Sequence, residues 1–114
     1  MLYRSLRRFM FLKAAIGREP YYFPDVSLDT LLQCYTEGRC DYLKMDIEGS
    51  EYEVLEQAIE NNSLVNVQQL AVEFHHWMTD RGCSATKRVV EMLRRDGYGI
   101  AWISRTNHEY LFVR

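Results

Sequence analysis

The chain has 114 residues, of which 47% are hydrophobic and 26% are charged, and its formal net charge at pH 7 is −2. This is the composition of an ordinary globular domain, so long disordered segments are not expected. The near-neutral charge gives no reason to expect nucleic acid or a membrane as a partner. Uncharged runs near the start, such as Phe9 to Leu12, are too short for a signal-peptide core or a membrane span.

The cysteines favour a reducing compartment. Cys34, Cys40 and Cys83 lack the close pairing of a zinc site, and their odd number argues against a closed set of disulfides. The simplest prediction is a cytoplasmic protein with ordinary thiols.

Residues 1–24 form an unassigned lead-in, and residues 25–114 form the predicted domain. A helix is predicted from Ser27, which can cap its N-terminus. Apolar residues then recur on one helical face. They are Leu28, Leu31, Leu32 and Tyr35. Gly38 is placed to end this helix.

The next segment predicts a strand followed by a helix. Asp41–Ile47 is short and mostly apolar, so we expect a strand buried on both faces. Glu48–Gly49 breaks the strand. Ser50 and Glu53 match a capping box, so the helix is expected to start there and to end at Asn61–Asn62.

A second strand is predicted at Val67–Phe74, a further helix at Ser84–Arg95, and a hairpin over residues 98–113. Strands that alternate with helices indicate an α/β fold. We therefore expect a mostly parallel sheet with helices on both faces and an antiparallel hairpin at its C-terminal end.

Acidic residues and histidines follow both predicted parallel strands. Asp46 and Glu48 end the first strand, and Glu73, His75 and His76 end the second. Ligands bind beyond the carboxyl ends of such strands, so these side chains are expected to converge. A carboxylate in an apolar strand is costly without a partner, which favours a function for Asp46. Glu48 is equally explained by favourable electrostatics at a helix N-terminus.

Several other kinds of site find no support. The sequence has no nucleophile elbow and no phosphate loop. Its one G-x-G, at residues 97–99, lacks the strand-to-helix setting of a dinucleotide fingerprint.

Three segments together resemble the FkbM-type methyltransferases. They are SLDTLL at residues 27–32, DYLKMDIEGSEYEVLEQA at 41–58 and QQLAVEFH at 68–75. The family carries a leucine-aspartate-leucine segment, a K-x-D-x-E-G-x-E turn and a strand ending in E-x-H, in this order. The resemblance covers residues 25–114 and implies the C-terminal half of a Rossmann-like class I methyltransferase domain. In that fold a C-terminal hairpin supplies the one antiparallel strand.

The resemblance also implies an activity. The family transfers a methyl group from S-adenosylmethionine, and the acceptor here is expected to be an oxygen of a small molecule or sugar. The resemblance assigns catalysis to Asp46, Glu73 and His75 and cofactor binding to Asp46 and Glu48. A histidine can remove the hydroxyl proton as the methyl group moves.

Two alternatives stay open. The glycine-rich loop and the acidic residue that hold the cofactor in the family's first half are not found here. The chain is therefore expected to be a fragment, and it could be a non-catalytic module that needs a partner chain. An unpaired strand edge at Tyr42–Ile47 would then favour self-association.

A second variant adds a metal ion. Catechol O-methyltransferase, which shares the class I fold, binds magnesium through acids after its fourth and fifth strands, and Asp46 and Glu73 occupy matching places. Oxygen ligands suit magnesium, whereas His75 would shift the preference toward a transition metal.

Overall fold

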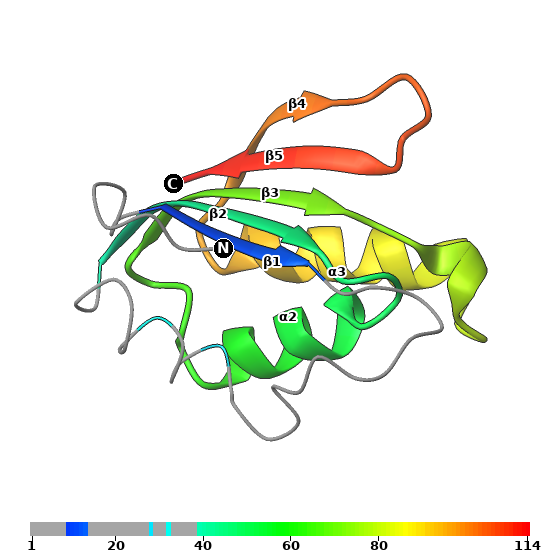
Figure 1. The fold of residues 1–114 in the computed structure, drawn as a ribbon, viewed down its shortest axis with the longest axis horizontal. Coiled ribbons are helices and arrows are strands. Elements are labelled where there is room, and N and C mark those ends of the chain that lie inside the picture. The colour runs from blue at the N-terminus through cyan, green and yellow to red at the C-terminus, as the bar shows by residue number, and fades with distance from the viewer. Residues whose placement is uncertain (1–8, 14–27, 29–31, 33–38) are drawn as a thin grey trace.

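The computed structural model describes residues 9–13, 28, 32 and 39–114. Within these residues, five strands form one sheet, accompanied by two continuous α-helices and a 3-10 turn (Figure 1). The strands are β1 (Phe9–Lys13), β2 (Cys40–Asp46), β3 (Val67–Glu73), β4 (Gly99–Ile103) and β5 (Glu109–Val113). The helical elements are α2 (Glu51–Glu60), η2 (His76–Met78) and α3 (Cys83–Arg95).

The sheet is mixed, with the strand order β1-β2-β3-β5-β4. β1, β2 and β3 pair in parallel, whereas β5 runs antiparallel to both β3 and β4. The predicted C-terminal hairpin is confirmed. The expectation of a mostly parallel sheet is wrong, because the hairpin contributes two antiparallel pairings beside the two parallel ones.

The strand β1 was not predicted from the sequence. It lies along β2, from the Phe9–Tyr42 pair to the Lys13–Asp46 pair. The expected open edge at Tyr42–Ile47 is therefore wrong: β1 and β4 are the outermost of the described strands. The short apolar run that was too brief for a signal peptide is long enough for an edge strand.

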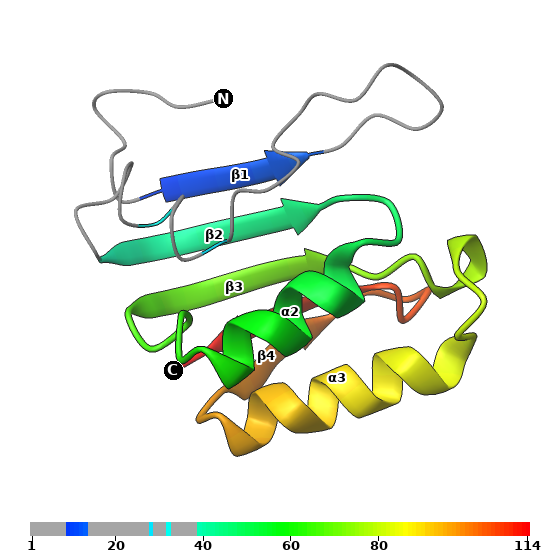
Figure 2. The same ribbon diagram turned by 90° about the horizontal axis from the view of Figure 1, so that it is seen from below.

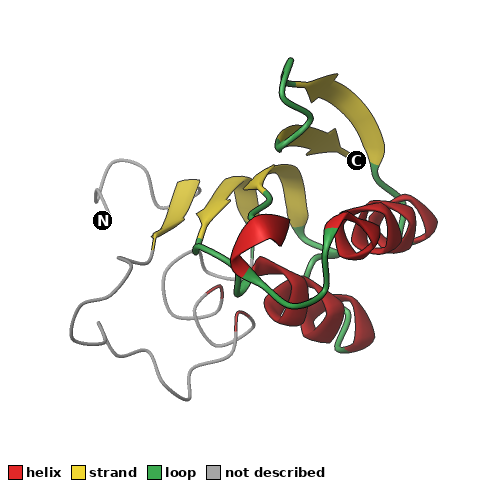
Figure 3. Cartoon of the chain, turned by 90° about the vertical axis from the view of Figure 1, so that its right-hand side faces the viewer, coloured by secondary structure: helices red, strands yellow, loops and turns green. Residues whose placement is uncertain are grey.

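Beyond Cys40, which is 1% exposed, only one face of β2 is buried. Leu43 and Met45 are 0% exposed, whereas Lys44 is exposed and Asp46 is partly exposed. The expectation of a strand buried on both faces is wrong for this reason. Among the described residues, α2 and α3 both pack on the same side of the sheet, so helices on both faces are not seen either (Figures 2 and 3).

The core lies between the sheet and these two helices. Tyr52 of α2 stacks on Phe74 with ring centroids 5.7 Å apart, and its hydroxyl shares a 2.8 Å hydrogen bond with Thr86 of α3. The largest fully buried apolar residues are Tyr52, Phe74, Phe112, Leu43, Met45, Leu55, Leu64, Leu70, Leu93, Val67 and Val72. They come from β2, β3, β5, both helices and the segments on either side of β3, so the core joins these elements into one unit.

The predicted helix ends are partly confirmed. α2 ends at Glu60 with Asn61 as its C-cap, and Asn62 follows with a φ of 55°. The capping box at the start of α2 is wrong, because the Ser50 side chain makes no capping hydrogen bond. After α3, Gly97 has a φ of 112°, a conformation that side chains other than glycine rarely adopt.

The helix predicted from Ser27 lies largely outside the described residues. Leu28 and Leu32 are described, and both are helical and buried in the core. No helix in the described part of the chain is long and apolar enough to cross a membrane.

The end of the sheet opposite to the carboxyl ends of β2 and β3 is closed by a buried tyrosine and the last residue. The Tyr98 hydroxyl donates to the backbone carbonyls of Val67 and Leu64, at 2.7 and 3.1 Å. The Arg114 guanidinium lies 4.2 Å from the Tyr98 ring centroid and pairs with Asp96 at 2.7 Å. Burial raises the pKa of Tyr98 to about 12, although Arg114 acts in the opposite direction.

We predict that Tyr98→Phe lowers the free energy of unfolding by about 1–2 kcal/mol near neutral pH, because the Val67 carbonyl loses the 2.7 Å hydrogen bond from the buried hydroxyl. The raised pKa adds a pH dependence. The unfolded tyrosine ionises near pH 10 and the folded one near 12. The wild type therefore holds this stabilisation below pH 10 and loses it as the pH rises toward 12. Urea unfolding of both proteins measures the gap, which is the difference between their free energies of unfolding.

The difference in the free energy of unfolding between wild type and Tyr98→Phe should narrow between about pH 10 and pH 12. Tyr110→Phe, a change at a partly buried tyrosine of β5, serves as the control and should keep the steep alkaline loss of the wild type. A constant gap across this range would contradict the assignment.

Candidate functional site

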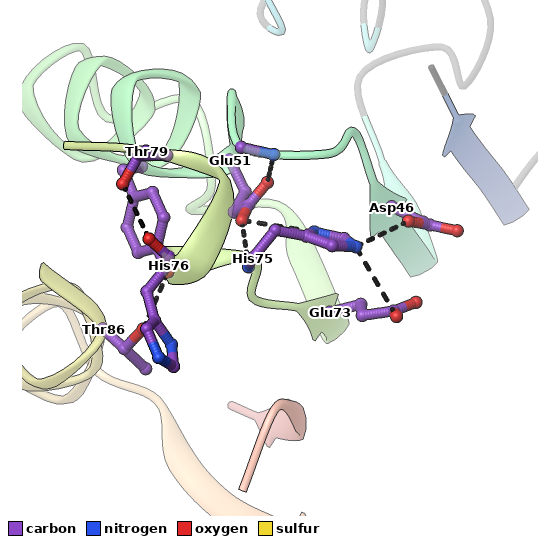
Figure 4. A network of polar contacts seen from close by, with 9 residues as sticks. Asp46, Glu51, Glu73, His75, His76, Thr79 and Thr86 are labelled. Carbon is purple, nitrogen blue, oxygen red and sulfur yellow. Dashed lines mark hydrogen bonds and ion pairs between the residues drawn. The ribbon is translucent and has the colours of Figure 1, made fainter. Parts of the chain in front are cut away.

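The predicted polar residues meet where two parallel strands end. Asp46 is the last residue of β2 and Glu73 the last of β3. The Met45–Val72 pair precedes them in the register, so the two strands end side by side. His75 follows two residues after Glu73, and its ring points at both carboxylates (Figure 4).

One nitrogen of His75 lies between two carboxylates. Its Nε2 is 3.4 Å from Asp46 Oδ1 and 3.5 Å from Glu73 Oε1. The imidazole is 7% exposed, whereas Asp46 and Glu73 are 25% and 38% exposed. The structure thus brings together the three residues expected to be catalytic, with a buried base behind two carboxylates that solvent can reach.

The histidine is held in place by Glu51, the first residue of α2. The Glu51 side chain is 0% exposed, and its two oxygens accept hydrogen bonds from the backbone N–H groups of His75 and Gly49, at 2.5 and 2.8 Å. Its Oε1 also lies 3.4 Å from His75 Nδ1. This is a charge–dipole or ion-pair contact and not a hydrogen bond, because Nδ1 has no hydrogen-bond partner in the described part of the chain.

Sequence reasoning missed Glu51 as a site residue. It is the last residue of the K-x-D-x-E-G-x-E run, so the signal was present. The capping-box interpretation directed attention to Ser50 and Glu53 instead. A buried carboxylate at this position is costly unless donors surround it, and the two backbone N–H groups supply them.

The turn between β2 and α2 has an unusual backbone. Glu48 and Gly49 have φ angles of 54° and 105°. A left-handed conformation costs a residue with a side chain about 1–2 kcal/mol. A Cβ at Gly49 would also lie 3.3 Å from Thr79 Cγ2. This turn reverses the chain so that Glu51 reaches back beneath His75.

Glu48, the second residue predicted to bind the cofactor, does not join the cluster of Asp46, Glu73 and His75. Its Oε2 is buried and has no hydrogen-bond partner among the described residues. A buried oxygen without a donor is unusual and is consistent with a ligand group that is not part of this chain. Lys44, by contrast, is exposed on the open face of the sheet.

An aromatic surface borders the cluster. Trp77 is 53% exposed, and its ring centroid is 5.4 Å from that of His75 and 4.3 Å from that of His108. His76 is partly exposed and contacts Trp77 and His108, so it does not join the cluster, and of the two adjacent histidines only His75 faces inward. The backbone of the β4–β5 turn is fixed here, because Phe74 N–H donates to His108 O at 2.7 Å.

This arrangement offers a limited set of chemistries. The imidazole can take a proton from a nearby hydroxyl. The carboxylates can accept hydrogen bonds or hold a cation, and ligand atoms of Asp46, Glu73 and His75 all lie within 4.8 Å of one another. The roles of these residues stay predictions.

Comparison with known proteins gives one match. A family model described as the methyltransferase FkbM domain matches residues 7–100. It begins before residue 25, where the recognisable motifs start, and includes β1. No curated protein and no solved structure matches the chain.

We predict that Glu51→Ala lowers the free energy of unfolding by about 2–4 kcal/mol, because two buried N–H groups lose their acceptor. Glu53→Ala, in the same turn of α2 but exposed, should change it by less than about 0.5 kcal/mol. Urea unfolding followed by circular dichroism measures both. Equal effects for the two variants would show that Glu51 does not organise this region.

Proposed function

Because the chain belongs to the FkbM methyltransferase family, we propose that it takes part in transfer of a methyl group from S-adenosylmethionine to an oxygen of a small molecule or sugar. The observation that carries this proposal is the convergence of Asp46, Glu73 and His75 at the rim of a sheet inside the matched segment. Oxygen acceptors are favoured because a hydroxyl must lose a proton, and His75 Nε2 is placed to take it.

Two acidic residues fit the cofactor. Its methionine part carries an ammonium group, for which a carboxylate is a suitable partner. Glu48 has a buried oxygen that lacks a donor, and Asp46 has a carboxylate at the wet end of β2. When bound, the cofactor supplies an electrophilic methyl group on a sulfonium.

His75 would act on the acceptor. As the new carbon–oxygen bond formed and the methyl carbon–sulfur bond broke to leave a neutral thioether, the hydroxyl proton would pass to Nε2. The resulting imidazolium would be stabilised by Asp46 and Glu73, which already lie 3.4 and 3.5 Å away. Glu51 keeps the ring in place, so little reorganisation is needed during the reaction.

The acceptor would be recognised by the neighbouring surface. The exposed ring of Trp77 offers a flat apolar face beside His75, and the Glu73 carboxylate offers an acceptor for hydroxyl groups. An aromatic face next to carboxylates supports a ring-shaped, hydroxylated acceptor such as a sugar.

Magnesium is a second proposed component, supported by the two carboxylate oxygens of Asp46 and Glu73. We expect methyl transfer to fall in a chelator and to recover when magnesium is added back. If the chelator leaves the rate of methyl transfer unchanged, the reaction does not require the cation.

The alternative function is a non-catalytic module that acts with a partner chain. It is favoured by exposed apolar residues on the outer strand β4, where Ile100, Trp102 and Ile103 are 37%, 53% and 40% exposed. In either case we propose a cytoplasmic location, which the exposed thiol of Cys83 supports.

Calorimetric titration of the full chain with S-adenosylmethionine tests the proposal. We expect one bound molecule per chain. Asp46→Asn and Glu48→Gln should each weaken binding by about 10- to 100-fold, because each loses a charged hydrogen bond. Glu60→Gln, an exposed change at the end of α2, is the matched control and should bind as the wild type does.

The outcome separates the two functions. A monomer on size-exclusion chromatography that binds the cofactor supports the enzyme. A self-associating chain without detectable cofactor binding supports the partner-dependent module.

A further inference from the structure

We propose that Asp46 Oδ1, Glu73 Oε1 and His75 Nε2 form a binding site for a first-row transition-metal dication, which the site prefers over magnesium. The inference concerns binding and does not depend on methyl transfer. It rests on four features of the cluster: the spacing of the three atoms, the support behind the histidine, the balance of charge and the kind of donor atoms.

The spacing suits a shared ion better than it suits direct hydrogen bonds. Nε2 is 3.4 and 3.5 Å from the two carboxylate oxygens, longer than the usual N–H···O range of about 2.7–3.2 Å. Ligands bound at about 2.1 Å in tetrahedral or octahedral geometry lie about 3.0–3.4 Å apart. The three ligand atoms all lie within 4.8 Å of one another, so movement of the two partly exposed carboxylates toward each other would bring all three around one ion.

The histidine is already held in the orientation of a metal ligand. A ligating imidazole commonly donates its second N–H to a carboxylate, which fixes the ring and its tautomer. Here Nδ1 faces the fully buried Glu51 Oε1 at 3.4 Å but has no hydrogen-bond partner among the described residues. A cation on Nε2 would place the proton on Nδ1, where Glu51 can accept it. The unpartnered Nδ1 of a ring that is 7% exposed is an observation independent of the two outer carboxylates.

The charges also call for a cation. Three carboxylates, those of Asp46, Glu51 and Glu73, lie within 3.5 Å of one imidazole. No lysine or arginine whose side chain the structure describes forms an ion pair with them. The ligand oxygens of Asp46 and Glu73 lie within 4.8 Å of each other, where like charges repel, and a dication between them would offset the repulsion.

The donor atoms select the class of ion. Two carboxylates alone would suit magnesium, whereas an imidazole nitrogen favours manganese, iron, cobalt or zinc. Asp46 and Glu73 are 25% and 38% exposed, so an ion between them would keep positions open for water or a substrate oxygen. A metal ion and a proton would compete for the same Nε2 atom. The metal affinity therefore also decides whether His75 acts as a metal ligand or as a proton acceptor.

Titration of the full, chelator-treated chain with Mn²⁺ tests the site, with free Mn²⁺ measured by electron paramagnetic resonance. We expect one Mn²⁺ per chain and an affinity for Mg²⁺, from competition, at least about tenfold weaker. Loss of a residue that only supports a metal ligand typically costs 10- to 100-fold in metal affinity. We expect at least this loss of Mn²⁺ affinity in each of three variants that remove a ligand: Asp46→Asn, Glu73→Gln and His75→Asn.

The matched control is Glu109→Gln. Glu109 is exposed and pairs with Glu73 across β3 and β5, so it carries the same charge at the same rim but does not belong to the cluster. Its Mn²⁺ affinity should equal that of the wild type. Circular dichroism spectra that match the wild type identify the folded variants, and His75→Gln replaces His75→Asn if the latter does not fold.

Three results would overturn the proposal: no saturable Mn²⁺ binding, an equal or higher affinity for Mg²⁺, or equal losses in Glu109→Gln and Glu73→Gln. The cofactor titration is separate. A chain that binds Mn²⁺ but not S-adenosylmethionine keeps the metal site and loses the proposed enzyme, and the reverse result loses only the metal site.

Discussion

The buried carboxylate of Glu51 is the constraint on which the candidate site depends. It accepts hydrogen bonds from the backbone of Gly49, in the turn after β2, and of His75, in the segment after β3. These two segments are far apart in the sequence, and one side chain joins them. Without such donors a carboxylate that is 0% exposed would be strongly unfavourable, so the turn, the helix start and the histidine are fixed together.

The sheet brings these parts within reach of that side chain. β2 and β3 are adjacent and parallel, so the segments that follow them leave the sheet on the same side. The C-terminal hairpin flanks the site on the β3 side. β5 pairs with β3, and the turn before β5 places His108 against Trp77. The same packing of α2 and α3 on one face of the sheet forms the core, and it sets the position of α2, from which Glu51 extends (Figure 3).

Much of this could be predicted from the sequence, since long amphipathic segments and turn residues reveal local structure. α2, α3, β2, β3 and the hairpin were expected close to their observed bounds, and Asp46, Glu73 and His75 were expected to converge. β1 was not predicted. Its five residues show neither alternation nor turn signals, and its formation depends on pairing with a strand that is distant in the sequence. One-sided burial of β2 also depends on where the helices pack, which the strand's own residues do not show.

The role of Glu51 could not be inferred from local patterns either, because its partners include a backbone group that lies 24 residues away. The most direct test of its importance is a pair of crystal structures, of the wild type and of Glu51→Gln. We predict that His75 Nε2 lies beside both Asp46 and Glu73 in the wild type, and that the ring leaves them in the variant, where an amide NH2 group replaces one acceptor oxygen. An unchanged His75 in Glu51→Gln would show that Glu51 does not hold the site together.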